Sequence, residues 1–513
     1  MSSLVALFDG VIDPARIIHD GVNDIYGPVT TGFVQPILAA LKPVSAEEIQ
    51  KIIAVARQNA IKLYPVSAGR NWGYSDSMPA GTGHVILDLS LMNRVHDYNS
   101  GMGIVTIEPG VTQQQLCDYL ERHGAHHVIS VTGSSPGASI VGNYLERGFG
   151  LLPIMDHAAS VMSLQAVLGD GTLYNSPLQS FGGTESANVF RWGSGPYTDG
   201  LFFQSSFGVA TSMTIKLARK PECVRACLVE VDSRENLDEA IRGLYEIREV
   251  CGVDSLQIKI LNGYYTLASM GVKHADVVSC GSIDQAYQRY SVPPYTIMVT
   301  FMGPRSITKA LQAEIKSSLK KFGRMKIVSD KIVRIASLAK PFVLLSFRKK
   351  IVALEGMWSL LQGKPGAMMI GRIPYYKTPD DRHLKKINPA QDKCGIIWFS
   401  QILPFRAQAI SDFEELGDYA QKTYGFSPIL NFTNYSHSCL IGLMAIVFDQ
   451  SSESEPAHEC YMDLLYRARD KGYFPYRMPI FASEEFLREN SGNEFNVKLK
   501  SILDPDGIFP RQC

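Results

Sequence analysis

The sequence predicts an α+β fold with two parts, a two-lobed domain rich in glycine turns and a second domain built on an antiparallel sheet. Residues 1–220 alternate short apolar strands and helices with glycine-rich turns. Pro221 marks a change, because strands and helices alternate over residues 221–449 with few such turns. Residues 450–513 are predicted to return to the first domain.

Composition excludes several classes of function. The chain has 513 residues, of which 45% are hydrophobic and 19% charged, enough for two or three globular domains. Acidic and basic residues number 50 each, and this zero net charge argues against a nucleic-acid partner. The sequence has neither a long apolar run nor a basic leader, so we expect no membrane partner and no secretory signal. Nine scattered cysteines without CxxC pairs favour reduced thiols in a cytoplasmic protein over a disulfide framework.

The first lobe begins with a helix over residues 45–59, since Ser45 caps an acidic first turn and apolar residues follow at helical spacing. Strands are predicted at residues 63–66, 85–89 and 103–108, and a further helix at residues 113–121. In the second lobe, residues 161–174 form a predicted hairpin, because Gly169, Asp170 and Gly171 separate two apolar strands.

The second domain is predicted to be an antiparallel sheet with helices on one face. Strands are expected at residues 229–231, 295–301, 395–404 and 440–449, and helices at residues 236–251 and 307–322. After them, a helix over residues 459–471 opens the segment that is predicted to return to the first domain.

Residues 64–75, YPVSAGRNWGYS, lead from a strand into a turn crowded with Gly69, Asn71 and Gly73. Small residues let successive backbone N–H groups point into one concavity, which can hold the oxygens of a diphosphate without a lysine. An ordinary turn is the alternative. Since no Walker motif and no GxGxxG opening a helix is present, a dinucleotide here would not lie in a Rossmann domain.

Three further stretches have the same kind of backbone, namely residues 107–111, 133–150 and 195–208. With the first turn, their order and spacing resemble the flavoprotein family of vanillyl-alcohol oxidase and p-cresol methylhydroxylase (PCMH). SAGRNWGY, GNYLERGFG and GPYTDGLFFQS are the specific motifs, and the resemblance covers nearly the whole chain. It implies a two-lobed PCMH-type FAD-binding domain and an antiparallel-sheet cap domain that closes the substrate cavity over the flavin.

The resemblance implies that these turns bind FAD, with the diphosphate on residues 67–71 and the isoalloxazine against residues 137–148. The expected cofactor-binding residues are Pro65, Ser67, Ala68, Gly69, Arg70, Asn71, Pro109, Gly110, Ser134, Ser135, Gly137, Gly142, Asn143, Glu146, Gly148, Gly208 and Val209. No metal is expected, because the histidines of residues 123–127 have no carboxylate or cysteine to complete a ligand set.

Covalent members of the family bond the flavin through a His or Tyr of the cap domain. Direct alignment of this sequence with the family segment that carries the tether puts Ile441 or Gly442 at that position, and neither can form the bond. A second family tether, a His in the first glycine turn, is replaced by Arg70. The sequence therefore predicts non-covalent FAD, and a bond to His437 or Tyr435 is the alternative.

Oxidation of the carbon para to a phenol requires the phenolate. A free phenol has a pKa near ~10, so hydrogen-bond donors and positive charge must lower it. By resemblance, the family's phenolate-binding trio falls on Tyr74, Tyr476 and Arg477. For a Tyr-Arg pair alone, a surface cation–π or salt-bridge contact is the alternative. Ser134 stands where family oxidases commonly place an acid near flavin N5, so vanillyl-type alcohols are in doubt as substrates.

The resemblance implies a FAD-dependent oxidoreductase, either an oxidase or a dehydrogenase. Its small-molecule substrate would be a 4-alkylphenol, a benzylic alcohol or a similarly activated compound, oxidised by hydride transfer to flavin N5. O2 or an electron-acceptor protein would reoxidise the flavin, and a homodimer is an expected assembly. The alternative is a FAD-binding protein with a diverged cavity, either non-redox or an electron-transfer flavoprotein.

Overall fold

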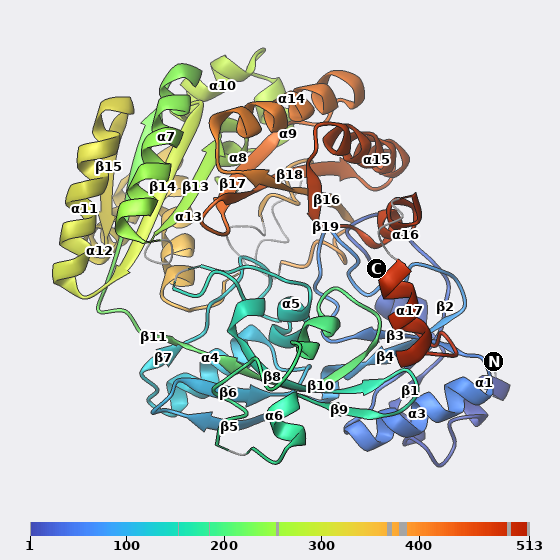
Figure 1. Ribbon diagram of the computed structural model, residues 1–513. Coiled ribbons are helices and arrows are strands. Elements are labelled where there is room, and N and C mark those ends of the chain that lie inside the picture. Colours follow the sequence, from blue (N-terminus) through green and yellow to red (C-terminus); the bar gives the residue numbers. More distant parts are fainter. Residues whose placement is uncertain are drawn as a thin grey trace.

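The computed structural model describes residues 2–151, 153–183, 185–252, 256–366, 372–378, 387–489 and 494–509. A large sheet with its helices lies above two smaller lobes in Figure 1. The two lobes and the large sheet form the mixed α and β architecture that the sequence predicts.

The first lobe is a four-stranded sheet in the order β1-β2-β4-β3, in which β2, β4 and β3 run parallel. Its elements are β1 (Ile17–Ile18), β2 (Ile37–Leu41), β3 (Lys62–Val66), β4 (His84–Asp88), α1 (Ser2–Ala6), α2 (Val22–Tyr26) and α3 (Ala46–Gln58). Ser45 caps α3 as predicted, since its Oγ accepts a hydrogen bond from the backbone N–H of Glu48 at 3.3 Å. Ile49, Ile52 and Ile53 of α3 are fully buried in the core of this lobe.

The second lobe is an antiparallel sheet in the order β5-β6-β10-β8-β9. Its strands and the pair beside it are β5 (Val95–Asn99), β6 (Ile104–Ile107), β8 (Val161–Leu168), β9 (Leu173–Asn175), β10 (Gly208–Lys216), β7 (His127–Val128) and β11 (Ala218–Arg219). Its helices are α4 (Gln113–Arg122), α5 (Ile140–Leu145) and α6 (Pro177–Ser180). Strands β8 and β9 confirm the predicted hairpin, with Gly171 at φ 89° in its turn.

The upper domain is an antiparallel sheet in the order β15-β12-β14-β13-β17-β18-β16-β19. Its strands are β12 (Cys223–Val231), β13 (Gln257–Asn262), β14 (Tyr295–Gly303), β15 (Arg324–Ser329), β16 (Cys394–Pro404), β17 (Ile429–Asn434), β18 (Cys439–Asp449) and β19 (Phe474–Arg477). Its helices are α7 (Arg234–Cys251), α8 (Gly263–Ser269), α9 (His274–Val278), α10 (Ile283–Tyr290), α11 (Arg305–Leu319), α12 (Asp330–Ala339), α13 (Leu345–Leu361), α14 (Ala407–Tyr424) and α15 (Ser454–Asp470).

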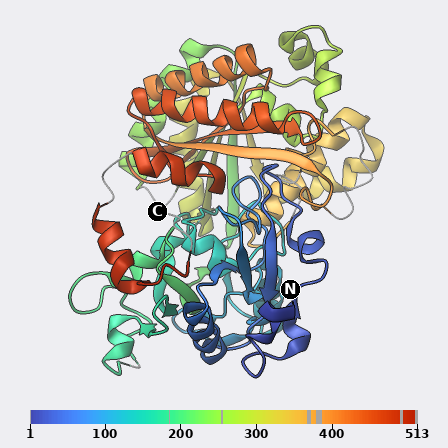
Figure 2. The same cartoon turned by 90° about the vertical axis from the view of Figure 1, so that its right-hand side faces the viewer.

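Helices α7, α11, α14 and α15 cover one face of this sheet, and the other face turns toward the two lobes (Figures 1 and 2). Their apolar residues form one core with the strands; Leu244 of α7, Ile315 of α11 and Phe413 of α14 are buried there. The two long apolar stretches predicted as buried strands are β16 and β18, which pair along their whole length. On the other face, α12 and α13 pack near β12 and β15, and α8 packs against β17. The part of this face between them is left to form the roof of a site.

The return to the first domain begins later than the predicted boundary at residue 450. Helix α15 packs in the core of the large sheet through Cys460 and Leu464, and β19 is the edge strand beside β16. The apolar face of α15 covers the end of the sheet, which explains why this segment stays in the upper domain. After β19, helix α16 (Ile480–Glu489) still packs in the core of the large sheet through Ala482 and Phe486. Helix α17 (Glu494–Leu503) lies beside the lobes (Figure 1), and after it Ile508 O accepts from Leu63 N at 2.9 Å.

None of the helices in the described ranges is both long and apolar enough to cross a membrane. In the same part of the chain, the cysteines are free thiols.

Candidate active site

A cavity of about 330 Å³ lies where the two lobes meet the lobe-facing side of the large sheet. On the side of the lobes, most of the residues in the ranges 64–72, 131–134, 138–151 and 202–210 line the cavity. The sheet contributes side chains from β13, β16, β17, β18 and β19. The glycine-rich turns and the upper domain, which are far apart in the sequence, therefore form one site.

The turn after β3 has the geometry of an anion-binding nest. Gly69 and Gly73 adopt φ values of 59° and 79°, which favour glycine. Within the described chain, the backbone N–H groups of residues 68–71 have no hydrogen-bond acceptor, although these residues line the cavity. Unpaired N–H groups in a concave turn suit the oxygens of a diphosphate. This turn therefore fits the diphosphate of FAD.

The chain is packed tightly where α5 meets the cavity. Ser139 Oγ accepts a hydrogen bond from Gly142 N at 2.9 Å, which caps α5. A Cβ on Gly148 would come within 2.2 Å of Asn143 Nδ2, so only glycine allows this approach. Behind the turn, His157 Nδ1 donates to Asn143 Oδ1 at 2.7 Å, and burial lowers the pKa of His157 to about 3. A neutral His157 thus holds Asn143 in place at the cavity wall.

Most of the predicted cofactor-binding residues line this cavity. They are Pro65, Ser67, Ala68, Gly69, Arg70, Asn71, Pro109, Ser134, Gly142, Asn143, Glu146, Gly148, Gly208 and Val209. Gly110, Ser135 and Gly137 do not line it. A Cβ on Gly110 would meet three carbonyl oxygens at 2.7–2.8 Å, and Ser135 Oγ accepts from Gly137 N at 3.1 Å. These three residues shape the turns instead.

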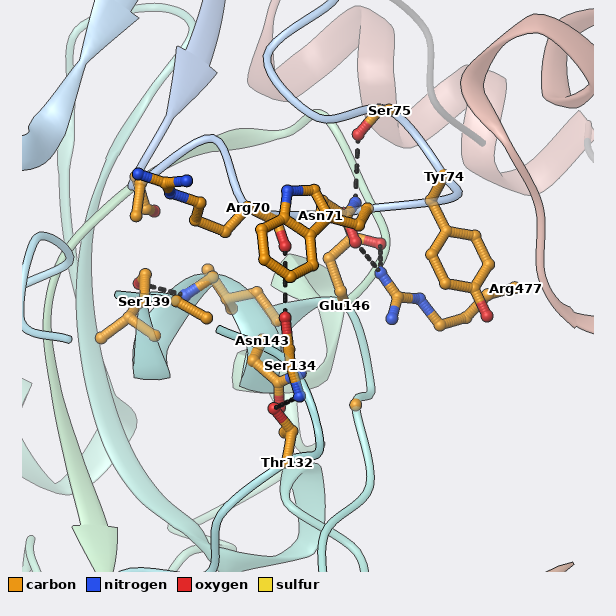
Figure 3. A pocket seen from close by; sticks show the side chains of 18 of the residues that line it. Arg70, Asn71, Tyr74, Ser75, Thr132, Ser134, Ser139, Asn143, Glu146 and Arg477 are labelled. Carbon is orange, nitrogen blue, oxygen red and sulfur yellow. Dashed lines mark hydrogen bonds and ion pairs between the residues drawn. The ribbon is translucent and has the colours of Figure 1, made fainter. Parts of the chain in front are cut away.

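Tyr74, Tyr476 and Arg477, the predicted phenolate trio, all line the cavity. Arg477 Nη2 donates to Asn71 Oδ1 at 2.8 Å and lies 3.1 Å from Glu146 Oε2. The guanidinium carbon is 4.1 Å from the centre of the Tyr74 ring, and Figure 3 shows Arg477 between that ring and Glu146. The trio comes from two segments distant in sequence, so the structure brings it together.

The polar atoms of the trio are buried and incompletely paired. Tyr74 Oη is 3.5 Å from Ser400 Oγ, and no described residue pairs with Tyr476 Oη or Arg477 Nε. Burial raises the pKa of both phenols, so they stay protonated and can donate hydrogen bonds at neutral pH. Burial opposes the charge on Arg477, but Glu146 and the neighbouring phenols outweigh it and raise the pKa of Arg477. This arrangement of unpaired donors beside a cation suits an anionic oxygen.

The two alternative tether residues do not line the cavity. The His437 side chain is 47% exposed and lies 3.8 Å from Glu249, on the α7 side of the sheet. Tyr435 is closer, since its ring centre is 5.6 Å from that of Tyr476. A Cβ on Gly442 would meet Leu403 and Phe413, so that position faces the helices. Non-covalent FAD therefore remains a prediction.

We therefore expect all of the flavin to leave the protein on acid precipitation. The measurement is the absorbance of supernatant and pellet after trichloroacetic acid treatment. Yellow colour in the pellet would contradict the prediction, and peptide mapping would then begin at Tyr435.

Sequence reasoning missed the residues that the large sheet contributes to the cavity. They include Lys259, Tyr265, Trp398, Asn431 and Leu443. It also missed Gln204, whose Nε2 donates to the backbone carbonyls of Tyr476 at 3.1 Å and Glu146 at 3.3 Å. The one available signal was Lys259, a lysine within the otherwise apolar stretch IKIL.

Comparison with known proteins supports this cofactor. The family described as FAD binding domain matches residues 37–176. The chain is 29% identical to 1'-carboxy-chondrochloren decarboxylase of Chondromyces crocatus, over 98% of this chain and 95% of that protein. It is 23% identical to the 4-cresol dehydrogenase [hydroxylating] flavoprotein subunit of Pseudomonas putida, over 95% and 89%. The crystal structure of p-cresol methylhydroxylase with substrate bound superposes with a TM-score of 0.86 at 20% identity, covering 99% of this chain and 95% of that one.

The fold and the cavity define a FAD-dependent oxidoreductase. More particularly, the chain is similar along nearly its whole length to PCMH-type FAD-linked oxidases.

Proposed function

We propose that the enzyme oxidises a small phenol at the benzylic carbon that is attached to the ring para to its hydroxyl group. The observation that supports the proposal is the convergence of Tyr74, Tyr476 and Arg477 on one end of the cavity, where unpaired donors and a buried cation can hold a phenolate oxygen. The name of the 4-cresol dehydrogenase relative agrees with this substrate class.

Each residue of the trio has a distinct part in this proposal. FAD, when bound, supplies the acceptor for the hydride that leaves the benzylic carbon attached to the para position. Arg477 lowers the pKa of the bound phenol, and the electron pair of the resulting phenolate makes hydride loss possible. Tyr74 and Tyr476 donate hydrogen bonds to the same oxygen. Asn71 and Glu146 hold the guanidinium in place, although the carboxylate of Glu146 also offsets part of its charge.

The remaining features of the reaction are also proposals. Non-covalent FAD is favoured by the absence of His437 and Tyr435 from the cavity lining among the described residues. Ser134 lines the cavity with its Oγ 3.5 Å from Arg70 O, so an uncharged hydroxyl takes the place of the family acid. We infer that a 4-alkylphenol is a better substrate than a benzylic alcohol. O2 or an acceptor protein takes the electrons, and a homodimer is the expected assembly.

A second outcome of the same oxidation is suggested by the relative named 1'-carboxy-chondrochloren decarboxylase. If the phenol carries a carboxylate on the carbon next to the oxidised one, hydride loss gives a quinone methide. The bond to the carboxylate can then break. Its electron pair forms the new carbon–carbon double bond and restores the phenolate, and CO2 leaves. We propose oxidative decarboxylation as the alternative reaction.

Anaerobic mixing with a panel of 4-alkylphenols tests the proposed function. We expect the flavin absorbance near 450 nm to bleach, since the family chromophore loses it on reduction, and mass spectrometry of the products separates the two outcomes. A product lacking two hydrogens or carrying an added oxygen indicates simple oxidation, and loss of CO2 from a carboxylated phenol indicates the alternative. A yellow protein that no phenol reduces would contradict both and favour an electron-transfer or non-redox flavoprotein.

A further inference from the structure

The roof of the cavity carries a cation that the phenol site does not use. Lys259 lies on β13 and lines the cavity. On the same face of this strand, Gln257 Nε2 donates to Gly150 O at 3.0 Å, so this face turns toward the lobes. Within the described chain, Lys259 has no ion pair and no side-chain hydrogen bond. Burial disfavours the charged form of this side chain and lowers the pKa of Lys259 to about 8.

Two polar side chains lie beside Lys259 on the same wall. Lys259 pairs with Thr433 across β13 and β17, which makes Asn431 its diagonal neighbour, about 7–8 Å away between backbones and within reach of a long side chain. Tyr265 of α8 also lines the cavity, and Asn431 hydrogen-bonds to its phenol. Burial raises the pKa of Tyr265 to about 12, so this phenol stays protonated and can donate. An ammonium, a phenol and an amide thus share one part of the wall.

The charge of Lys259 is not balanced by the protein. The cavity lining has two other cations, and each has a carboxylate near it. Arg477 pairs with Glu146, and the carboxylate of Asp76 interacts electrostatically with Arg70. No carboxylate among the described residues acts on Lys259. A desolvated ammonium without a counter-ion costs free energy, and an anion that enters the cavity would offset that cost. Lys259 is therefore suited to bind a negatively charged group of a ligand.

The position of Lys259 favours an anion of the substrate over the diphosphate of FAD. The unpaired N–H groups that suit the diphosphate belong to residues 68–71 of the first lobe, and the FAD binding domain match ends at residue 176. Lys259 instead belongs to the large sheet, which carries two of the three residues of the phenol site.

The strand order separates Lys259 from the phenol site. One cross-strand row contains Arg477, Ser400, Leu443, Asn431 and Leu261. Four strand spacings therefore lie between β19 and β13, about 19 Å between backbones. Lys259 is two residues beyond Leu261 on the same face of β13. A substrate that contacts both must therefore span the part of this distance that the side chains of Arg477 and Lys259 do not cover.

We propose that Lys259, together with Tyr265 and Asn431, binds a carboxylate at the end of the substrate remote from its phenol oxygen. The substrate class is then a phenol with an acidic side chain. This proposal rests on the proposed function for the phenol, whereas the anion subsite is tested without any turnover.

The test measures binding to the FAD-loaded enzyme after anaerobic reduction, so that neither probe is oxidised. The two probes are 3-(4-hydroxyphenyl)propanoate and 4-propylphenol, and calorimetry gives both Kd values. We expect Lys259→Met to weaken binding of the acid by roughly 10- to 100-fold, the range of a charged hydrogen bond, and to change binding of the alkylphenol by less than about twofold. Lys259→Arg keeps the charge and is expected to retain much of the affinity.

Lys326→Met is the matched control, because Lys326 lies on β15 of the same sheet and pairs with Glu230 outside the cavity. Its Kd values should equal those of the unmodified enzyme. The pH dependence is a further readout: affinity for the acid should fall above pH about 8, where Lys259 loses its proton. Tyr265, the titratable side chain beside Lys259 on this wall, stays protonated in that range. In Lys259→Arg this fall should be absent.

Equal weakening of both probes by Lys259→Met would overturn the proposal and place the lysine against the flavin or in the fold. The same conclusion follows if the unmodified enzyme does not bind the acid more tightly than the alkylphenol. Selective loss of acid binding in an enzyme that oxidises no phenol would support the subsite while contradicting the proposed function.

Discussion

Replacement of Arg477 by alanine is expected to lower the rate of flavin reduction by a phenol roughly 10²–10³-fold near neutral pH. The guanidinium is the one cation of the described lining that touches Tyr74, and it lies at the end of the cavity proposed to hold the phenolate. Without it the bound phenol returns toward its ordinary pKa of about 10, so little phenolate forms at pH 7. Anaerobic stopped-flow measurement of flavin reduction gives the rate directly.

The pH dependence separates electrostatic from structural effects. In Arg477→Ala the reduction rate should rise as the pH approaches about 10, where the phenol ionises unaided, whereas the unmodified enzyme should change little over the same range. Tyr74→Phe and Tyr476→Phe each remove one neutral donor, worth about 0.5–1.5 kcal/mol, so their rates should fall by roughly 2- to 13-fold. The arginine change is therefore the largest of the three.

Arg477→Lys is the control that keeps the charge but loses the paired contacts with Asn71 and Glu146. We expect an intermediate rate and an unchanged FAD content. An unchanged reduction rate in Arg477→Ala would show that Arg477 only braces the chain between residues 71 and 146, and that the substrate is not held as a phenolate.

Replacement of Gly69 by valine is expected to abolish stoichiometric FAD binding. Gly69 has φ 59°, a conformation that a β-branched residue adopts only with strain of about 1–3 kcal/mol. A Cβ at this position would also lie 2.2 Å from Ser77 Oγ, so the turn must move. Because the unpaired N–H groups of residues 68–71 point to one concavity only in this conformation, we expect at least a tenfold loss of FAD affinity. The flavin-to-protein absorbance ratio of the purified variant measures it.

Gly83→Val is the matched control for backbone strain. Gly83 lies in the same lobe at φ 75° and does not line the cavity, and a Cβ added there would extend into open space. This variant should lose stability without losing FAD. If Gly69→Val retains one FAD per chain, the diphosphate does not lie on this turn.

Much of the local structure could be predicted from the sequence, because its causes are local. Ser45 caps α3 through a hydrogen bond to a residue three positions away, and Gly171 allows the turn between β8 and β9. The glycine turns that suit a diphosphate were visible for the same reason. The boundary near residue 450 was placed two helices and one strand too early, since the amphipathic patterns of α15 and α16 do not say which core they cover.

The residues of the candidate site also fall into those that short motifs predicted and those that depend on the pairing of distant strands. The predicted trio came from a resemblance in short motifs, and the structure brings its members together, but their chemistry as a site remains proposed. Lys259 and Asn431 could not be assigned, because their meeting depends on the pairing of β13 with β17, strands that lie far apart in the chain. A pattern of apolar residues says that a stretch is a strand without saying which strand lies beside it.

The neutral charge balance, the glycine-rich turns and many of the helices and strands could be predicted from the amino-acid sequence, because they depend on composition and on residues near one another in the chain. Only the tertiary structure decided which side chains face one another across the cavity. Arg477 donates to Asn71 over a separation of 406 residues, and Lys259 shares a wall with residues of β17 through the register of the large sheet. Packing of α7, α11, α14 and α15 on one face of that sheet sets which alternate side chains turn to the other face, and hence which of them reach the site.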